Sequence, residues 1–423
     1  MIFKELIKKK RDGGKLSRSE VEFVVESYTK GETPDYQMAA FLMAVFFRGL
    51  DHQETLAFTD AMLRSGERVN VEVEGTIVDK HSTGGIGDKV SLVIAPTLAE
   101  LGFKAPLLAG RALGFTGGTI DKLESTGMKV ELNPQEITEV TRRFGFSISA
   151  QTEEIAPADR KIYALRDATS TVESIPLIVS SILSKKLAVN TDAIVFDVKV
   201  GTGAFMKRME EAEELAEGLV EVSKLYGKRA GALITEMSQP LGRFAGNALE
   251  VKEAIEALGG KPQEDLLEVT SSLVGLLFQL TGRGGFEEGK EKAIEVITSG
   301  RALKRFLSWI EFLGGDPDVK VAEKVVQVKA PVSGYVAQIN GEALGYLIIE
   351  LGGGRKRAGE PIDYSVGLGF RKKIGERVEK GEVIGEIYYS KGSPEEFVEK
   401  FLKAFTFTEG EVERPKLIKK RVV

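Results

Sequence analysis

The chain contains no cysteine and only two histidines among its 423 residues. The lack of cysteine excludes disulfide bonds, thiolate metal sites and a cysteine nucleophile. Long hydrophobic runs are also missing. The longest, MAAFLMAVFF at 38–47, is too short to span a bilayer, and the N-terminal residues lack the apolar centre of a signal peptide. We therefore expect a soluble, cytoplasmic protein with no membrane partner.

The chain has no strong excess of charge of one sign. Its formal net charge is −5, with acids and bases interspersed. This argues against a general nucleic-acid binder and leaves room for a local basic pocket. Charged residues make up 29% of the chain, against only 5 asparagines and 9 glutamines, a balance typical of proteins from thermophiles.

Three patterns follow one another along the sequence. Residues 1–66 have the apolar spacing of helices, and Ser19 is the expected N-cap of one of them. From residue 76, short β-branched runs end in glycine-rich loops and alternate with helical patterns, which predicts a parallel sheet covered by helices. After about residue 325, short alternating strands with frequent turns predict a smaller α+β unit.

A helical stretch interrupts the strand–helix alternation and is expected to join the N-terminal helices. We therefore predict an α/β plus all-α protein with three parts. These are a discontinuous helical domain (1–66 plus 158–190), a larger α/β domain with a mostly parallel sheet (76–154 plus 191–325) and a small C-terminal α+β lobe (326–423). Parallel sheets bind ligands at the carboxyl ends of their strands, where the glycine-rich loops would lie.

Two common glycine motifs for phosphate binding are absent. In a Walker A loop, serine or threonine follows the lysine, but Val90 follows Lys89 here, and Asp88 stands in place of the second glycine. The segment GTGAFM at 201–206 ends in methionine where a dinucleotide loop needs its third glycine. The sequence therefore supports neither a P-loop ATPase nor an NAD enzyme.

The loop DKHSTGGIGDKVS at 79–91 can still bind an anion. Its glycines let backbone N–H groups approach a phosphate, and it also carries a lysine and several hydroxyl groups. An ordinary strand-to-helix turn would contain the same glycines. A second such loop, AGRALGFTGGTIDKLES at 109–125, favours the binding interpretation, because two loops on neighbouring strands can surround one small anion.

A third cluster of polar residues lies between these loops and the C-terminal part. A helix through 172–186 would place Ser181 and Lys185 on one face, four residues apart, and Arg166 can join them. This arrangement suits a planar, hydrogen-bonding ligand that becomes negatively charged. The alternative is a set of solvated basic residues on the surface.

Taken together, these segments resemble the corresponding blocks of the pyrimidine-nucleoside phosphorylases. The resemblance rests on KHSTGGIGDKVS, GRALGFTGGTIDKLES, YALRDATSTVESIPLIVSSILSKKLA and DVKVGTGAFM, and it extends to the N-terminal helices and to MSQPLGRFAGNALEVKEA. It implies reversible phosphorolysis of uridine, thymidine or deoxyuridine to free base and (deoxy)ribose 1-phosphate. It also implies that phosphate binds to the α/β domain, that the base binds to the helical domain, that this domain forms a homodimer, and that the chemistry requires no cofactor.

The resemblance also assigns roles to individual residues. The implied phosphate site comprises Lys80, Ser82, Ser91, Ala109 and Thr119. The implied base site comprises Arg166, Ser181 and Lys185, surrounded by Tyr163, Leu113, Val172, Ile178 and Phe205. The implied catalytic residues are His81, Arg166 and Lys185. An unperturbed imidazole pKa near 6.5 would let His81 protonate a base carbonyl near neutrality; the alternative is that it is purely structural or only orients phosphate.

The chain departs from the family pattern at several positions. Ala109 stands where serine is usual, and Phe115 where histidine is usual. Some members bind a monovalent or calcium cation, and the matching positions are Gly87, Lys89, Leu241, Phe244 and Glu253. Lys89 replaces a small residue, so either a structural cation or the lysine ammonium in its place is expected there.

Three other functions fit parts of the sequence. A strictly thymidine-preferring phosphorylase differs only in the room left for the sugar 2′-hydroxyl, which the sequence does not reveal. A phosphoribosyltransferase of related fold, such as anthranilate phosphoribosyltransferase, also uses a Thr-Gly-Gly loop, but it leaves the arginine–serine–lysine cluster unexplained. A non-catalytic nucleoside- or phosphate-binding protein would have no need to keep Lys80, His81, Arg166 and Lys185 together.

Overall fold

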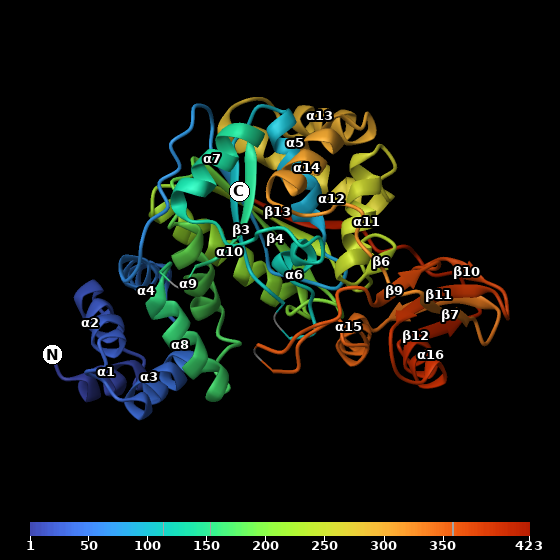
Figure 1. Ribbon diagram of the computed structural model, residues 1–423. Helices are drawn as coiled ribbons and strands as arrows, with labels where there is room; N and C mark the ends of the chain where they lie inside the picture. Colours follow the sequence, from blue (N-terminus) through green and yellow to red (C-terminus); the bar gives the residue numbers. More distant parts are fainter. Residues whose placement is uncertain (113, 153, 358) are drawn as a thin grey trace.

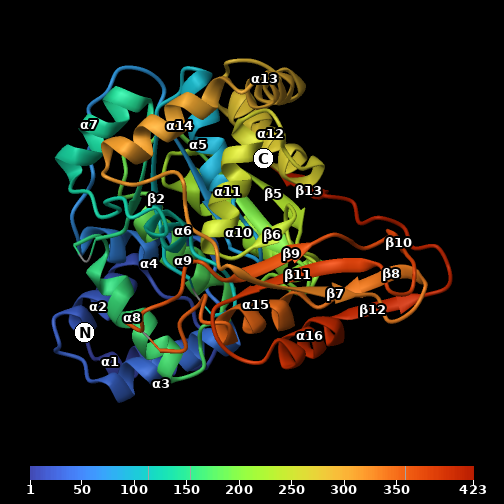
Figure 2. The same ribbon diagram turned by 45° about the vertical axis from the view of Figure 1, so that its right-hand side comes forward.

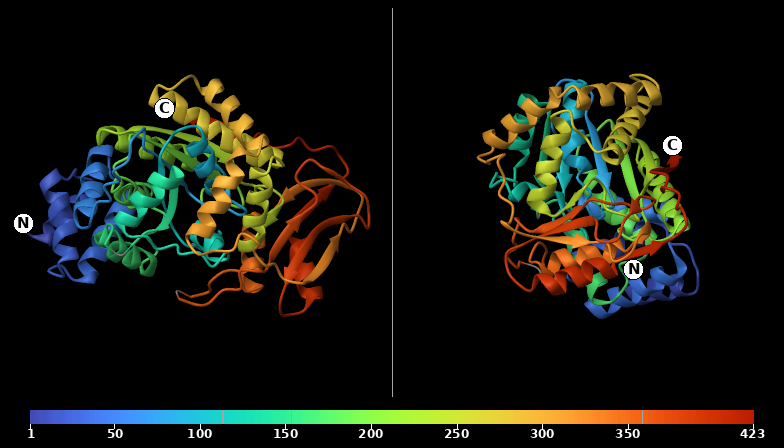
Figure 3. Two further views of the ribbon diagram at one scale, coloured as in Figure 1. Left: turned by 45° about the horizontal axis from the view of Figure 1, so that its top comes forward. Right: turned by 90° about the vertical axis from the view of Figure 1, so that its right-hand side faces the viewer.

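The computed structural model describes residues 1–112, 114–152, 154–357 and 359–423. The N-terminal helices and the C-terminal lobe lie at opposite ends of a central α/β domain (Figure 1; Figure 3, left). None of the helices in these ranges has the length and the apolar character that crossing a membrane requires.

The helical domain is built from two segments of the chain. A hydrophobic core of its own joins side chains from Phe3 to Met62 with Ala158, Ile162 and Leu177. The helices are α1 (Phe3–Arg11), α2 (Arg18–Thr29), α3 (Asp35–Arg48), α4 (His52–Arg64), α8 (Pro157–Ala168) and α9 (Ile175–Lys186). Figure 2 shows α8 beside the N-terminal helices.

The N-cap of α2 is Ser17, so the expected cap at Ser19 is wrong. Both serines have a glutamate three residues later, as a capping box requires. Ser17 and Glu20 form the box, whereas Glu22 instead accepts hydrogen bonds from Arg18 and Arg64 on the surface.

The central domain contains the mostly parallel sheet that the strand–helix alternation predicts. Strands β1, β4 and β5 pair in parallel in the main sheet, and β2 pairs in parallel with β3 in a second sheet of two strands. The strands are β1 (Val78–Ser82), β2 (Ala105–Ala109), β3 (Phe146–Ala150), β4 (Ala193–Val200) and β5 (Arg229–Glu236). All eight residues of β4 are buried, as expected for a strand covered by helices on both faces.

Helices cover these two sheets and connect their strands. They are α5 (Val90–Glu100), α6 (Thr119–Glu124), α7 (Pro134–Phe144), α10 (Met209–Leu225), α11 (Asn247–Leu258), α12 (Glu264–Thr281), α13 (Phe286–Thr298) and α14 (Arg301–Phe312). The loops after β1 and β2, which lead into α5 and α6, are the two glycine-rich segments. Both therefore lie at carboxyl ends of parallel strands.

The C-terminal lobe consists of small antiparallel sheets with two helices. Its elements are β7 (Lys324–Lys329), β8 (Gly334–Ile339), α15 (Gly341–Glu350), β9 (Gly367–Phe370), β10 (Arg377–Val378), β11 (Val383–Tyr389), α16 (Pro394–Lys403) and β12 (Phe405–Thr408).

The sheets do not follow the predicted boundary of this lobe at 326–423. Strand β13 (Ile418–Val422) leaves the lobe and pairs antiparallel with β5 of the central sheet. In return β6 (Phe244–Ala245), from the α/β segment, pairs with β9 in the lobe. Strand exchange of this kind depends on long-range hydrogen bonds, which local patterns do not show.

Candidate active site

The first glycine-rich loop brings three of the predicted phosphate residues together. Lys80 is buried in the middle of β1, and its Nζ lies 3.2 Å from Oγ of Ser91 in the first turn of α5. The Ser82 hydroxyl donates to the Asp88 carboxylate and accepts from the Gly84 N–H at 3.1 Å. Gly84 has φ +85°, in the left-handed region that favours glycine.

Asp88 is a charged residue of this loop that the sequence interpretation did not single out. Burial alone would raise its pKa, but the ammonium groups of Lys199, Lys80 and Lys122 outweigh burial and hold the pKa well below its usual range. Lys199 itself lies 2.6 Å from Asp197 in the sheet. In the segment DVKV of β4, the two-residue spacing places Asp197 and Lys199 on one face of the strand. This spacing would have allowed their prediction from the sequence.

The second glycine-rich loop is tied to the first by Lys122. Its buried Nζ donates to the Asp88 carbonyl at 2.5 Å and lies 2.9 Å from the Glu250 carboxylate. Ala109 ends β2, and half-buried Thr119 begins α6. Leu113, predicted to line the base site, lies outside the described residues.

Phe115, which stands where the family usually has histidine, packs in an aromatic cluster. Its ring centroid lies 5.5 Å from that of Phe205 and 5.9 Å from that of Tyr346 in α15. Phe205, predicted to contact the base, thus lies against the second loop. The lobe helix α15 reaches the same loop, so the lobe helps to shape this part of the site.

Six of the predicted base-binding residues lie on α8, on α9 and in the loop between them. Helix α9 begins at Ile175 rather than near 172, because Pro176 suits a first turn, so half-buried Val172 stays in the loop. Lys185 Nζ donates to Ser181 Oγ at 3.0 Å, as the four-residue spacing predicts. It also donates to Asp159 of α8 at 2.5 Å, a partner that the spacing does not reveal.

Arg166 does not share these bonds. Its guanidinium donates to the backbone carbonyls of Thr171, Val172 and Leu177, and it lies 5.7 Å from the centroid of the half-buried Tyr163 ring. Among the described residues, no hydrogen bond joins Arg166 to Ser181 or Lys185. Arg166 therefore holds the loop that leads into α9, and half-buried Ile178 lies in the first turns of that helix.

Lys186 joins the base-binding helix to the phosphate-binding strand. Its Nζ lies 3.0 Å from Asp79 Oδ1 and 2.8 Å from the Leu108 carbonyl. Asp79 immediately precedes Lys80 in β1. The end of α9 is therefore fixed against β1 and β2.

His81 lies where these groups meet. Burial is the largest cause that lowers its pKa, and Lys186, Lys80 and Lys185 lower it further, to well below 6.5. The expectation of an unperturbed imidazole pKa is therefore wrong. His81 is neutral at pH 7, and its ring can donate one N–H and accept at the other nitrogen.

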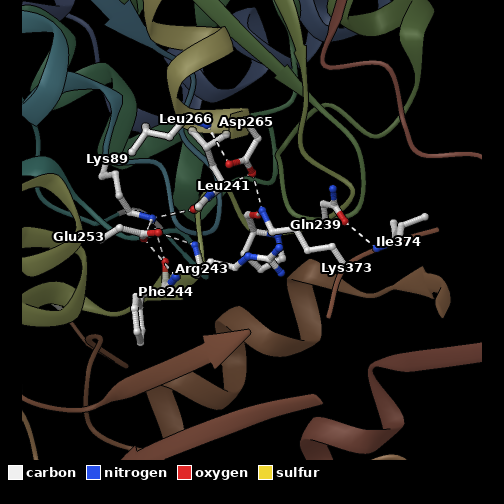
Figure 4. Close-up of polar contacts among 12 residues, drawn as sticks. Lys89, Gln239, Leu241, Arg243, Phe244, Glu253, Asp265, Leu266, Lys373 and Ile374 are labelled. Carbon is white, nitrogen blue, oxygen red and sulfur yellow. Dashed lines mark hydrogen bonds and ion pairs between the residues drawn. The ribbon is translucent and has the colours of Figure 1, made fainter. Parts of the chain in front are cut away.

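Three of the residues predicted to hold a cation surround the ammonium of Lys89 (Figure 4). Lys89 Nζ lies 2.6 Å from the Glu253 carboxylate, 2.6 Å from the Leu241 carbonyl and 2.9 Å from the Phe244 carbonyl. Burial would lower the pKa of Lys89, but Glu253 and Glu250 outweigh it and raise the pKa. This lysine is therefore charged.

A cavity of about 240 Å³ lies where the chain crosses between the helical and α/β domains. Its lining includes Glu67, Leu108, Asn133, Thr152 and Glu154, and none of the described residues predicted for the site. The site proposed from sequence is thus defined by its polar side chains rather than by this cavity.

Comparisons with known proteins agree with the architecture. The fold is that of the glycosyl transferase family: a model of its helical bundle domain matches residues 4–66, and a model of its a/b domain matches residues 74–303. A third model, the pyrimidine nucleoside phosphorylase C-terminal domain, matches residues 335–408.

Similar proteins of known name identify the family within the glycosyl transferase fold. The chain is 42% identical to the pyrimidine-nucleoside phosphorylases of Geobacillus stearothermophilus and Bacillus subtilis, with 98% of each chain covered in both comparisons. The chain belongs to the pyrimidine-nucleoside phosphorylase family. Among solved structures, anthranilate phosphoribosyltransferase from Thermus thermophilus shares the fold, with a TM-score of 0.59 and 22% identity over 73% of this chain and 99% of that one.

Proposed function

We propose that this protein catalyses the reversible phosphorolysis of pyrimidine nucleosides. Uridine, thymidine or deoxyuridine reacts with phosphate to give the free base and (deoxy)ribose 1-phosphate. The observation that carries this proposal is the bond network of Lys186, which fixes the Ser181–Lys185 helix against the strand of Lys80 and His81. Family membership supports the same reaction.

Phosphate is the nucleophile in this proposal. Lys80 supplies charge, and Ser82, Ser91 and Thr119 supply hydroxyl groups. A phosphate held against the anomeric carbon makes the displacement effectively unimolecular. Cleavage of the C–N bond inverts that carbon and leaves negative charge on the base.

The base leaves as an anion that cations can stabilise. We assign this stabilisation to Arg166 and to Lys185, which Asp159 and Ser181 orient. Because their interaction with the base strengthens as negative charge develops on it, they lower the barrier to C–N bond cleavage. Because His81 is neutral at pH 7, we assign it the role of an N–H donor to the base carbonyl beside the glycosidic bond. This role needs no imidazolium in the ground state.

The exposed face of α3 supports a homodimer through the helical domain. Tyr36 and Phe47 are each 75% exposed, and Met43 and Phe46 lie between them on the surface. Large apolar side chains that cluster on one helix mark an association surface. We propose a second copy of this chain as the partner, and nucleoside salvage in the cytoplasm as the setting.

One assay tests the reaction and its specificity. The protein is incubated with uridine, thymidine or deoxyuridine, with and without phosphate, and free base is followed by absorbance. Phosphate-dependent release from all three nucleosides is the expected result, and release from thymidine alone selects the strictly thymidine-preferring alternative. A Lys80→Met variant is the control for phosphate binding. Absence of release from every pyrimidine nucleoside contradicts the proposal, and an arm with phosphoribosyl pyrophosphate tests the transferase alternative.

A further inference from the structure

Lys89 occupies the centre of the site where the family resemblance implies a free cation. An ammonium group has three N–H donors. The three oxygens around it belong to Glu253, Leu241 and Phe244, which the resemblance assigns to the ion, at 2.6, 2.6 and 2.9 Å. The side chain of Lys89 is fully buried, and that of Glu253 is 3% exposed.

The site does not fit a separate ion beside Lys89. A Cβ on Gly87 would lie 2.8 Å from the Leu241 carbonyl oxygen, and a Cβ on Gly242 would lie 2.7 Å from Lys89 Nζ. Both glycines close the site around the ammonium. A monovalent or calcium ion bound to the same oxygens would touch the charged nitrogen, which opposes its binding.

Glu253 continues the network into the backbone. Its two carboxylate oxygens accept the N–H groups of Arg243 at 2.5 Å and Phe244 at 3.1 Å. The turn at 241–244 therefore presents carbonyls to the ammonium and N–H groups to the carboxylate. Each charge has several partners, so this buried pair avoids the cost of an unpaired ion.

The same turn is held from the other side by the C-terminal lobe (Figure 4). Lys373 pairs with Asp265, whose carboxylate also accepts the Gly242 N–H at 3.0 Å. Strand β6 begins at Phe244 and pairs with β9 of the lobe. Lys89 belongs to the first glycine loop and bonds to the carbonyls of this turn. The turn therefore connects the C-terminal lobe to the loop that carries the phosphate residues.

We propose that the Lys89 ammonium is a built-in cation that fixes the 241–244 turn against the first glycine loop, so that this protein needs no dissociable monovalent or calcium ion there. Lys89 is then a positioning residue. Its ammonium is bonded to Glu253, Leu241 and Phe244, and in this role it acts through the loop that leads to Ser82 and Ser91.

The test compares the wild-type protein with Lys89→Thr and Lys89→Met. Threonine removes the ammonium and leaves the oxygens facing an empty position that an ion can fill. Methionine is the matched control, because its apolar side chain fills the position that an ion would occupy and supplies no oxygen ligand. Thermal unfolding is measured at constant ionic strength in potassium chloride, calcium chloride or tetramethylammonium chloride.

The wild-type Tm should agree within about 1 °C in all three salts, since no ion binds at this site. In tetramethylammonium both variants should unfold about 5–10 °C lower, because a buried carboxylate has lost its partner. Potassium or calcium should restore most of this loss in Lys89→Thr and none in Lys89→Met. A wild-type Tm that rises with potassium or calcium overturns the proposal, as does a Lys89→Thr variant that neither ion stabilises. The wild-type arm decides even where a variant fails to fold.

A kinetic readout separates positioning from general stability, and it rests on the proposed phosphorolysis. Without potassium or calcium, Lys89→Thr should raise the phosphate KM about tenfold, the scale expected from small displacements of a binding loop, with kcat nearly unchanged. The ion that restores its Tm should restore this KM. A fall in kcat with an unchanged phosphate KM overturns the positioning role. Absence of base release by the wild-type protein refutes the proposed function and leaves the thermal comparison valid.

Discussion

Replacement of Lys186 by methionine tests the electrostatic link between the two halves of the site. In the protein, Lys186 Nζ donates to Asp79 Oδ1 at 3.0 Å, to the Leu108 carbonyl at 2.8 Å and to the Lys80 carbonyl at 3.3 Å. Asp79 is completely buried, and its Oδ2 has no hydrogen-bond partner among the residues that the structure describes. Methionine keeps the length of the side chain and removes the charge, so the Asp79 carboxylate loses its ion-pair partner.

The expected loss is large because the pair is buried. Removal of one partner of a buried ion pair costs about 3–5 kcal/mol of unfolding free energy. Lys9→Met is the matched control: it breaks a 2.8 Å pair with Glu20 in which Lys9 is 40% exposed, and exposed pairs contribute about 0–1 kcal/mol.

The sign of the pH dependence follows from Asp79. Burial raises its pKa, and Lys186 opposes that rise. Without Lys186 the pKa of Asp79 rises further, so the folded variant binds a proton that the unfolded chain has released. Stability of this kind is present at low pH and is lost as pH rises through the folded-state pKa. The deficit of Lys186→Met should therefore be largest at neutral pH and should shrink on acidification.

Urea unfolding at several pH values measures the deficit. The double variant Asp79→Asn/Lys186→Met removes the stranded charge and should recover part of the loss, with a coupling energy of about 0.5–3 kcal/mol in a double-mutant cycle. Because Lys186 is the charge that lowers the His81 pKa most, the acid limb of the kcat/KM profile should move to higher pH in Lys186→Met. The reasoning is refuted if Lys186→Met loses no more stability than Lys9→Met, or if its deficit grows on acidification.

Five further predictions follow from the structure. His81→Asn should lower kcat about 100-fold with little change in phosphate KM; an unchanged kcat in single-turnover base release would exclude its proton-donor role. Because the pKa of His81 lies below 6.5, the wild-type protein should lose stability below about pH 6.5, and His81→Asn should lose less in acid unfolding. Ala109→Ser restores a hydroxyl group at the end of β2 and should lower the phosphate KM about 2- to 10-fold, as one hydrogen bond of about 0.5–1.5 kcal/mol allows; the serine has no role if KM is unaffected. Asp159→Asn releases Lys185 and should raise the nucleoside KM about tenfold while the phosphate KM stays constant. A general loss of folding would not change one KM selectively. Phe47→Glu places a charge on the exposed face of α3 and should convert the dimer to a monomer, as measured by sedimentation. A wild-type protein that already sediments as a monomer would contradict this prediction.

Much of the fold and of the candidate site was accessible from local patterns. Strand-to-helix loops rich in glycine mark the carboxyl ends of parallel strands, so the positions of Lys80, Ser82 and Ser91 follow from the order of elements. The helical spacing of Ser181 and Lys185 predicts their contact, which the structure shows at 3.0 Å. These features involve residues within about one turn or one loop of each other.

The charges that act on the site come from distant parts of the chain. Lys186 is 107 residues from Asp79, and Lys89 is 152 residues from Leu241. A pKa depends on burial and on every charge nearby, whatever its position in the sequence. The neutrality of His81 could therefore not be predicted from its own loop.

The sequence by itself determined which chemical groups this protein brings to bear: two glycine-rich loops with lysine and hydroxyl groups, and a basic face on one helix. The tertiary structure decided their electrical state and their mutual position. It placed three lysines around His81, closed the 241–244 turn on the Lys89 ammonium and carried β13 back into the central sheet. Local patterns record side-chain chemistry and periodicity, whereas burial and through-space charge arise only when distant segments pack together.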